Sequence, residues 1–148
     1  MISDEELSGR FPDIRLDHEN KHFYRGLLER QLLLSQCADC GRWSGQPRAL
    51  CPHCLRWSMR PVPVSGHGTI ALITYLHQGP PAPGVDYASP YPLVAVDLAA
   101  QPGVRFSSTL VPPRTDAVVG DPVELVWAER DGHPLPAFRL LRGEARSG

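Results

Sequence analysis

The chain has 148 residues, of which 42% are hydrophobic, so it can bury one moderate core or two small modules and is too apolar for general disorder. Its formal net charge is -1 with a pI of about 6.6, and the 15 basic residues (14 Arg and Lys21) are spread along the chain, which excludes a bulk attraction to nucleic acid or anionic membrane. No apolar run approaches the roughly 20 residues of a membrane span, and the acidic start lacks an apolar signal region, so a cytoplasmic location is expected.

The first 30 residues predict an N-terminal arm followed by a short helix. Residues 1–16 are polar without a clear period, which predicts a loose arm that orders on a partner. Asp17 or Asn20 can cap the helix, and Phe23 and Leu27 share one of its faces. A helix this short is unstable alone in water, so it must dock on another part of the chain or on another protein.

Two C-x-x-C pairs dominate the next segment. They contain the only four cysteines of the chain and are separated by ten residues. Two intervening residues let a tight turn aim both sulfurs at one ion, and four thiolates form the closed tetrahedral set of a structural zinc site. The predicted ligands are Cys37, Cys40, Cys51 and Cys54. Such a site has no open coordination position, so we expect it to hold structure and to do no chemistry.

Alternatives to zinc remain open from the sequence. A pair of disulfides is disfavoured because intracellular thiols stay reduced, and the iron of a rubredoxin-like redox centre ranks second as the metal. His53 is a substitute ligand, but with four sulfurs present we interpret it as a solvated turn residue. The excess negative charge of the site is expected to be balanced by the flanking Arg42, Arg48 and Arg56.

Extended segments should surround the cysteines as a compact zinc ribbon. Residues 32–36 predict a strand that enters the first pair, residues 46–50 a return strand, and residues 57–64 an extended exit. Trp43 and Trp57 flank the cysteine pairs and are expected to shield the metal.

The remainder of the chain contains only strand signals. Alternating apolar residues predict five short strands, within residues 70–77, 93–98, 104–111, 123–128 and around 138–140. In the first, Ile70, Leu72 and Leu76 are expected on one face, and a proline-rich loop over residues 78–92 follows it. Five strands suit a Greek-key barrel of the OB type, whereas a sandwich normally needs more.

The fold prediction is therefore mainly β. We expect an N-terminal arm and short helix over residues 1–30, a rubredoxin-like zinc ribbon over 31–64, a five-stranded OB-type barrel over 65–141 and a frayed tail over 142–148.

The sequence contains no motif for catalysis by the chain alone. G-x-S-x-G, G-x-G-x-x-G and P-loop patterns are absent, and the four thiols are committed to the metal. His18 and His22 are one helical turn apart but have no third ligand nearby, so a solvated helix face is favoured over a metal site. His77 at a strand end is the one histidine considered for a site, with a plain surface role favoured.

Binding of single-stranded nucleic acid is the alternative function for an OB barrel. Barrels that bind nucleic acid use aromatic and basic residues on the second and third strands. Here the second strand has neither, and the third offers only Arg105 and Phe106, with Phe106 expected in the core. Nucleic acid is therefore the disfavoured partner.

The order of features resembles a known family. A short helix, a four-cysteine ribbon and an OB-type barrel are similar to the acyl-CoA-associated zinc-ribbon/OB-fold proteins, catalogued as domain of unknown function thirty-five. The matching segments are residues 32–41, 47–48, 51–54, 65–70, 90–96, 119–123 and 136–139, within a match over about residues 18–141. One departure is residues 43–46, where the family carries an aromatic residue and paired prolines.

The resemblance implies an accessory role. Members of the family pair with thiolase-fold enzymes, and some connect them to a second acyl-CoA enzyme such as a hydratase or an aldolase. The family's barrel helps to form the channel for the CoA pantetheine arm. We therefore expect a non-catalytic scaffold subunit of a thiolase-fold acyl-CoA enzyme complex. The N-terminal helix and the 78–92 loop should contact the partner or CoA, with Tyr87 and Tyr91 as candidates; packing under the barrel mouth is the alternative role of these tyrosines.

Overall fold

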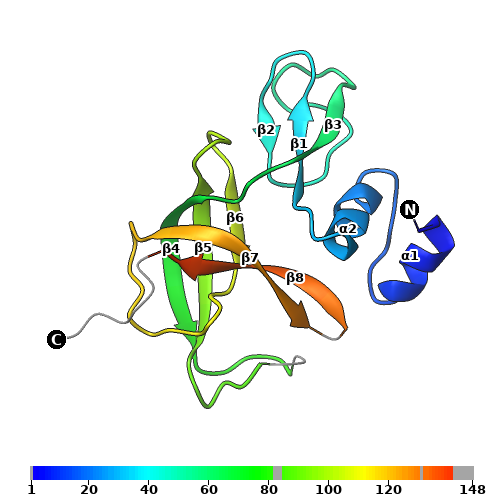
Figure 1. The fold of residues 1–148 in the computed structure, drawn as a ribbon. Helices are drawn as coiled ribbons and strands as arrows, with labels where there is room; N and C mark the ends of the chain where they lie inside the picture. Colours follow the sequence, from blue (N-terminus) through cyan, green and yellow to red (C-terminus); the bar gives the residue numbers. More distant parts are fainter. Residues whose placement is uncertain (1, 82–84, 131, 142–148) are drawn as a thin grey trace. The chain divides into compact units, whose positions relative to one another are not determined.

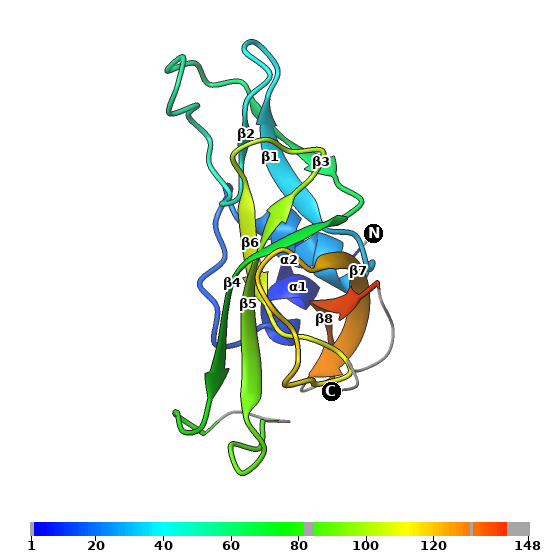
Figure 2. The same cartoon turned by 90° about the vertical axis from the view of Figure 1, so that its left-hand side faces the viewer.

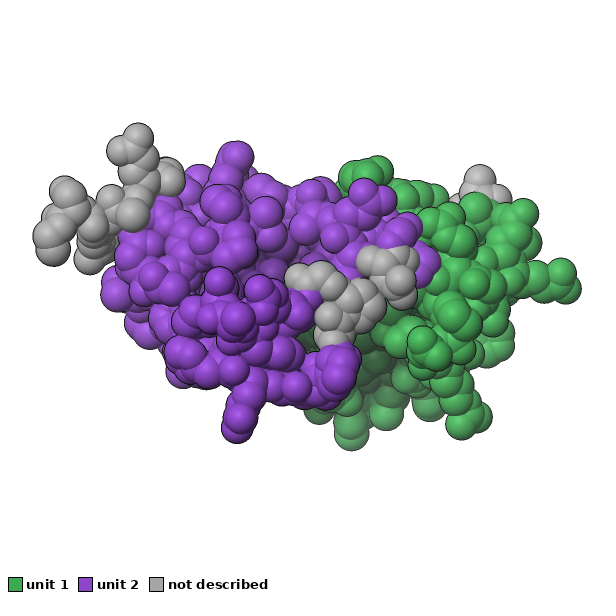
Figure 3. All heavy atoms as spheres, turned by 90° about the horizontal axis from the view of Figure 1, so that it is seen from below, with its two compact units in different colours: residues 1–64 green, residues 65–148 purple. Residues whose placement is uncertain are grey.

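The computed structural model describes residues 2–81, 85–130 and 132–141 (Figure 1). The chain divides into two compact units, residues 1–64 and residues 65–148, which are coloured separately in Figure 3. The expected tail over residues 142–148 lies outside the described residues. Neither helix in the described residues has the length and hydrophobicity of a membrane span.

The first unit begins with a helix that the sequence analysis missed. Helix α1 (Asp4–Arg10) lies where a loose arm was expected, so that expectation is wrong. Its start is a capping box: the Ser3 hydroxyl accepts a hydrogen bond from the N–H of Glu6, and the Glu6 carboxylate accepts one from the N–H of Ser3. Leu7 is fully buried, and Asp4 pairs with Arg25 of the next helix. The helix is therefore held by docking as well as by its cap.

Helix α2 (Lys21–Leu28) is the short helix that the sequence predicts. It follows a turn in which the Asp17 carboxylate accepts hydrogen bonds from the N–H groups of Glu19 and Asn20. The Asn20 side-chain oxygen accepts in turn from the N–H of Asp17 at 2.8 Å. Leu27 is buried on the inner face of the helix. Both predicted capping residues are thus used, although they order the turn ahead of the helix and do not cap the helix itself.

The ribbon is a three-stranded antiparallel sheet in the order β2-β1-β3. Strand β1 (Leu33–Cys37) is central and confirms the predicted entry strand, and β3 (Met59–Pro63) pairs with it along its whole length. The return strand is β2 (Trp43–Ser44), so the prediction of a return strand over residues 46–50 is wrong. Pro47 explains the difference, because it has no N–H to donate to a sheet.

The second unit is a near-closed barrel with the strand order β6-β5-β4-β7-β8 (Figures 1 and 2). Its strands are β4 (Gly68–Leu76), β5 (Tyr91–Leu98), β6 (Arg105–Ser108), β7 (Pro122–Arg130) and β8 (His133–Leu140). The chain after β6 reaches β8 through a parallel bridge between Leu110 and Phe138. There the N–H of Val111 donates to the Phe138 carbonyl at 2.8 Å, and the N–H of Phe138 donates to the Thr109 carbonyl at 3.0 Å. The predicted mainly β fold with an OB-type barrel is confirmed.

A β-bulge in β4 changes which residues face the core. The pairing of β4 with β5 shifts between Ile70 and Leu72. One extra residue reverses the inward and outward faces of the strand beyond it. Ile70 is buried as expected, but Leu72 is 59% exposed, so its predicted core position is wrong. Tyr75 takes an inward place instead, and its hydroxyl donates to the Ala117 carbonyl at 3.0 Å.

Glycine is required where the chain enters the barrel. Gly66 has φ +82°, and a Cβ at this position would lie 2.3 Å from the Cβ of Leu125. Neither the backbone conformation nor the space admits a side chain. The close approach explains why a glycine stands just before β4.

Candidate metal centre

The first cysteine pair forms a closed turn at the end of β1. The N–H of Gly41 donates to the Cys37 carbonyl at 2.9 Å, and the N–H of Cys37 donates to the Arg42 carbonyl at 2.9 Å. Gly41 has φ +78°, as expected for the residue after a C-x-x-C pair. The turn therefore brings the sulfurs of Cys37 and Cys40 to one side.

The second pair repeats this hydrogen-bond pattern. The N–H of Leu55 donates to the Cys51 carbonyl at 3.0 Å, and the N–H of Cys51 donates to the Arg56 carbonyl at 2.9 Å. Leu55 occupies the place of Gly41 and has φ +62°. We call the two turns the first and second knuckles, residues 37–42 and 51–56. A bulky residue in this left-handed conformation is unusual.

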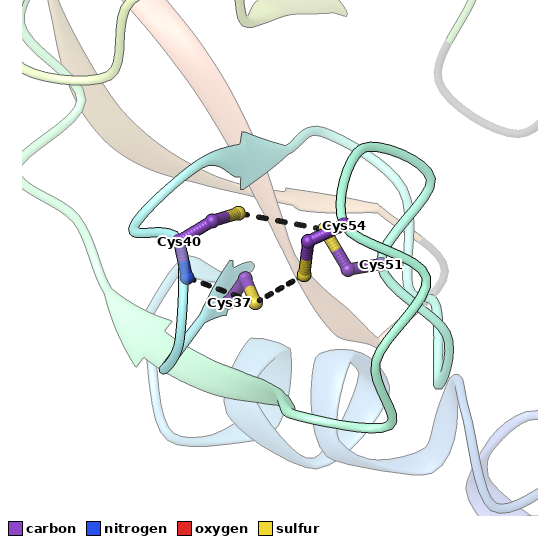
Figure 4. Close-up of side chains that lie close together, drawn as sticks. All are labelled: Cys37, Cys40, Cys51 and Cys54. Atoms are coloured by element: carbon purple, nitrogen blue, oxygen red, sulfur yellow. Dashed lines mark hydrogen bonds between the residues drawn. The ribbon is translucent and has the colours of Figure 1, made fainter.

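The four sulfurs converge between the knuckles (Figure 4). All four lie within 4.8 Å of one another, and the pairs Cys37–Cys54 and Cys40–Cys51 are each 3.6 Å apart. Tetrahedral sulfurs at the usual Zn–S distance of about 2.3 Å would be about 3.8 Å apart. The cluster therefore has the size of a four-sulfur metal site, and its sulfurs are too far apart to be bonded as disulfides.

Backbone N–H groups favour the thiolate form of two of the sulfurs, which is the form that binds a cation. The N–H of Cys40 points at the Cys37 sulfur at 3.5 Å and lowers the pKa of that thiol. In the second knuckle the N–H of Cys54 lowers the pKa of Cys51 to about 6. The N–H of Arg56 also lowers the pKa of Cys54, but burial and the neighbouring Cys37 sulfur outweigh it and raise this pKa to about 12. Four thiolates cannot gather here without a cation to balance them.

Residues around the knuckles only partly match the expectations. His53 is exposed and lies 2.7 Å from Arg42 through its Nδ1, which agrees with its interpretation as a solvated turn residue. Arg56 lies 4.0 Å from the Asp39 carboxylate. Trp43 is half-buried in β2. Trp57 is 77% exposed, so the prediction that it shields the metal is wrong.

The histidines form no second metal site in the described residues, where the four cysteines are the only cluster of suitable ligands. His18 lies in the turn before α2 and His22 in its first turn. Both line a hollow of about 240 Å³ between α2 and the ribbon sheet. Burial, followed by the nearby Lys21 and Arg25, lowers the pKa of His22. His77 lies just beyond β4 and is exposed.

Tyr87 and Tyr91 are held by contacts within the barrel unit. Their rings are 6.5 Å apart and edge to face, and the Tyr87 hydroxyl donates to the Pro80 carbonyl at 3.1 Å. Arg130, at the end of β7, donates to the Tyr91 hydroxyl, and its guanidinium lies 5.8 Å from the centre of the Tyr91 ring. No sequence pattern connects Arg130 with Tyr91, because 39 residues separate them and only the barrel brings them together.

Two family models match most of the chain. Residues 25–58 match the model described as "ChsH2, rubredoxin-like zinc ribbon domain", and residues 61–128 match "ChsH2, C-terminal OB-fold domain". With four clustered sulfurs in the first of these domains, the expected cofactor, structural zinc, is confirmed.

Solved structures and a curated relative agree with the family models. A chain of the structure described as "Ltp2-ChsH2(DUF35) aldolase" is 29% identical, with a TM-score of 0.74 over 86% of this chain and 98% of that chain. A DUF35 protein of unknown function from Sulfolobus solfataricus shares the fold, at 16% identity and a TM-score of 0.60 over 93% of this chain and 94% of that chain. A probable enoyl-CoA hydratase alpha subunit from Thermomonospora curvata is 30% identical over 130 residues, which are 86% of this chain. The chain spans 39% of the length of that relative.

Proposed function

Because the chain belongs to the DUF35 family of zinc-ribbon/OB-fold proteins that includes ChsH2, we propose that it is a non-catalytic accessory subunit of an acyl-CoA enzyme. The observation that carries the proposal is the match to 98% of a chain from the Ltp2-ChsH2(DUF35) aldolase, because it extends over ribbon and barrel together. The relative described as a probable enoyl-CoA hydratase alpha subunit supports the same class of substrate.

The zinc centre would serve as a scaffold. We propose that Cys37, Cys40, Cys51 and Cys54 all ligate the zinc, which leaves it no open position for a substrate or water. The ion would join the two knuckles and would also hold the end of β1, since Cys37 is the last residue of that strand. Structural zinc of this kind supplies folding free energy to a small sheet that cannot bury a large core.

We also propose that the partner subunit has a thiolase fold. This part rests on the family resemblance seen in the sequence. A second acyl-CoA enzyme, such as a hydratase, would be a further member of the complex. The activity of the whole assembly would then reside in the partner subunits, with this chain shaping the approach to their active site.

The barrel would contribute to the acyl-CoA channel near the β4–β5 connection. Tyr87 and Tyr91 are half-buried there, and Arg130 positions the Tyr91 ring from the end of β7. Aromatic rings fixed by a cation give a rigid apolar wall with polar edges, which suits the mixed chemistry of a pantetheine arm.

Nucleic-acid binding has less support from the barrel. Arg105, the basic residue of β6, pairs with Asp97 at 2.8 Å. Phe106 is half-buried, with its ring 6.2 Å from that of Phe138. The charge of Arg105 is therefore partly offset by Asp97, and the Phe106 ring packs within the barrel, which disfavours base stacking on it.

Affinity purification of the tagged chain from its own host tests the proposal. We expect an acyl-CoA enzyme subunit in comparable amount, identified by mass spectrometry, and turnover of a CoA thioester by the complex but not by the isolated chain. Salt-dependent binding of the isolated chain to oligonucleotides, without such a partner, would overturn the proposal.

A further inference from the structure

We propose that Leu55 and Trp57, which we call the exposed apolar pair, insert into an apolar pocket of the partner subunit whose rim is acidic. The inference rests on the proposed function, because it names the surface through which this chain would bind an acyl-CoA enzyme subunit. It concerns the second knuckle and the residues that follow it, all within the first unit.

The exposure of the pair is the first observation. Leu55 is 68% exposed and Trp57 is 77% exposed, the two highest values among the exposed large hydrophobic residues described. Single exposed apolar residues are ordinary on protein surfaces. Here two lie within three positions, and the exposed Arg56 lies between them. Tryptophan and arginine are among the residue types enriched in binding hot spots.

The backbone of Leu55 is the second observation. At φ +62° it adopts a left-handed conformation that glycine reaches without steric cost, and the first knuckle has glycine at the corresponding place, Gly41. The leucine side chain is mostly exposed, so packing inside the chain does little to offset its strained backbone. Strain retained at an exposed position points to a function outside the folded chain.

The surroundings of the pair are positively charged, and this charge indicates an acidic rim on the partner's pocket. Residues 31–64 contain a single acidic side chain, Asp39, against the four arginines Arg42, Arg48, Arg56 and Arg60. The two excess negative charges of a zinc–tetrathiolate centre reduce this positive balance but do not reverse it. Among the described residues, Arg48 and Arg60 form no ion pair. An acidic rim on the partner would complement these arginines.

A recess beside Trp57 completes the surface. Trp57 lines the hollow of about 240 Å³ together with Phe23 of α2 and Met59 of β3, and Arg48 and Arg60 line it as well. The pair would enter the partner while a side chain of the partner enters this hollow. A surface with both a projection and a recess restricts the orientation of docking.

Binding of the full-length, zinc-loaded chain to the purified subunit that co-purifies from the host tests the inference. We expect Leu55→Gly and Trp57→Ala each to weaken binding at least tenfold at unchanged zinc content. The matched control is Leu72→Ala, which removes a similarly exposed leucine from the barrel and should change binding less than twofold. Because glycine suits the backbone at position 55, lost binding by Leu55→Gly cannot be attributed to an unfolded knuckle.

Two results would overturn the inference, and they differ in whether the proposed function survives. If the wild-type chain binds an acyl-CoA enzyme subunit and both variants bind it within twofold of wild type, the pair is not the contact and the proposed function survives. If the wild-type chain captures no such subunit, the proposed function fails and the inference fails with it.

Discussion

The N–H of Leu55 donates a 3.0 Å hydrogen bond to the carbonyl of Cys51, and this turn holds Leu55 at φ +62°. Gly41 makes the equivalent bond to Cys37 in the first knuckle. One chain thus contains the same turn with and without a side chain at its left-handed position, which allows the cost of that side chain to be measured.

Leu55→Gly should stabilise the ribbon by about 0.5–1 kcal/mol. The free energy gained by removing the left-handed strain exceeds the free energy lost because glycine makes the unfolded chain more flexible. Thermal unfolding of the zinc-loaded protein would measure the change. The reciprocal Gly41→Leu should destabilise the ribbon by a similar amount, since no atom lies within 4 Å of a Cβ placed there. Equal stability of Leu55→Gly and wild type would show that the turn tolerates leucine without strain.

Cys51→Ser should remove the zinc and partner binding together. Elemental analysis should give about one zinc per chain in the wild type and almost none in the variant, because three thiolates leave the tetrahedral set incomplete. His53→Ala is the matched control from the same knuckle and should keep its zinc, since His53 is exposed and paired with Arg42. Partner binding by the metal-free variant would contradict the scaffold role of zinc.

Gly66→Ala should destabilise the barrel by about 2 kcal/mol or more, because the new Cβ meets Leu125 in addition to adopting a strained φ. Gly103→Ala is the control with the same sign of φ but open space around its Cβ, and it should cost about 1 kcal/mol. Thermal unfolding of both variants separates the steric part from the backbone part. Equal losses would mean that the approach of Leu125 relaxes without cost.

The pKa of the Asp4 carboxyl should lie below the ordinary value for aspartate. Its hydrogen bond with Arg25, followed by the charge of Lys21, lowers the pKa of Asp4 from 3.8. The carboxylate therefore contributes stability above about pH 4, and this contribution is lost as the pH falls through the lowered pKa. A carbon-detected NMR titration of the Asp4 carboxyl should find a midpoint below 3.8, and Arg25→Gln should move it back up. A midpoint unaffected by Arg25→Gln would exclude this ion pair as the cause.

Arg130→Met should raise the KM of the complex for its acyl-CoA by about five- to tenfold, on the proposal that Tyr91 lines the channel. The variant loses the cation beside the Tyr91 ring and the hydrogen bond to the Tyr91 hydroxyl, which together should cost about 1 kcal/mol of binding free energy. Arg105→Met removes a barrel arginine paired with Asp97 and should leave KM unchanged. Steady-state kinetics of the purified complex would test both, and a KM unchanged in Arg130→Met would remove Tyr91 from the channel.

Local patterns predicted most of the elements. The alternation of Val94, Val96 and Leu98 predicted a strand, and all three are buried. The segment that forms helix α1 is polar and has no period, which predicts a loose arm, although the capping box of Ser3 and Glu6 is a readable helix signal. The burial of Leu7 also stabilises this helix, but it depends on the folded chain and has no local sequence pattern.

Short-range patterns predict the two knuckles and the five strands, and the number of strands favours a barrel. Two residues between cysteines form a knuckle, and apolar residues with a period of two form a strand, so neither prediction needs a contact between distant segments. Three features are visible only in the folded chain: the exposure of Trp57, the outward side chain of Leu72 and the contact of Arg130 with Tyr91. Leu72 faces outward because of the bulge in β4, and Arg130 contacts Tyr91 because the barrel brings together segments 39 residues apart, so packing and not local preference selects these two positions.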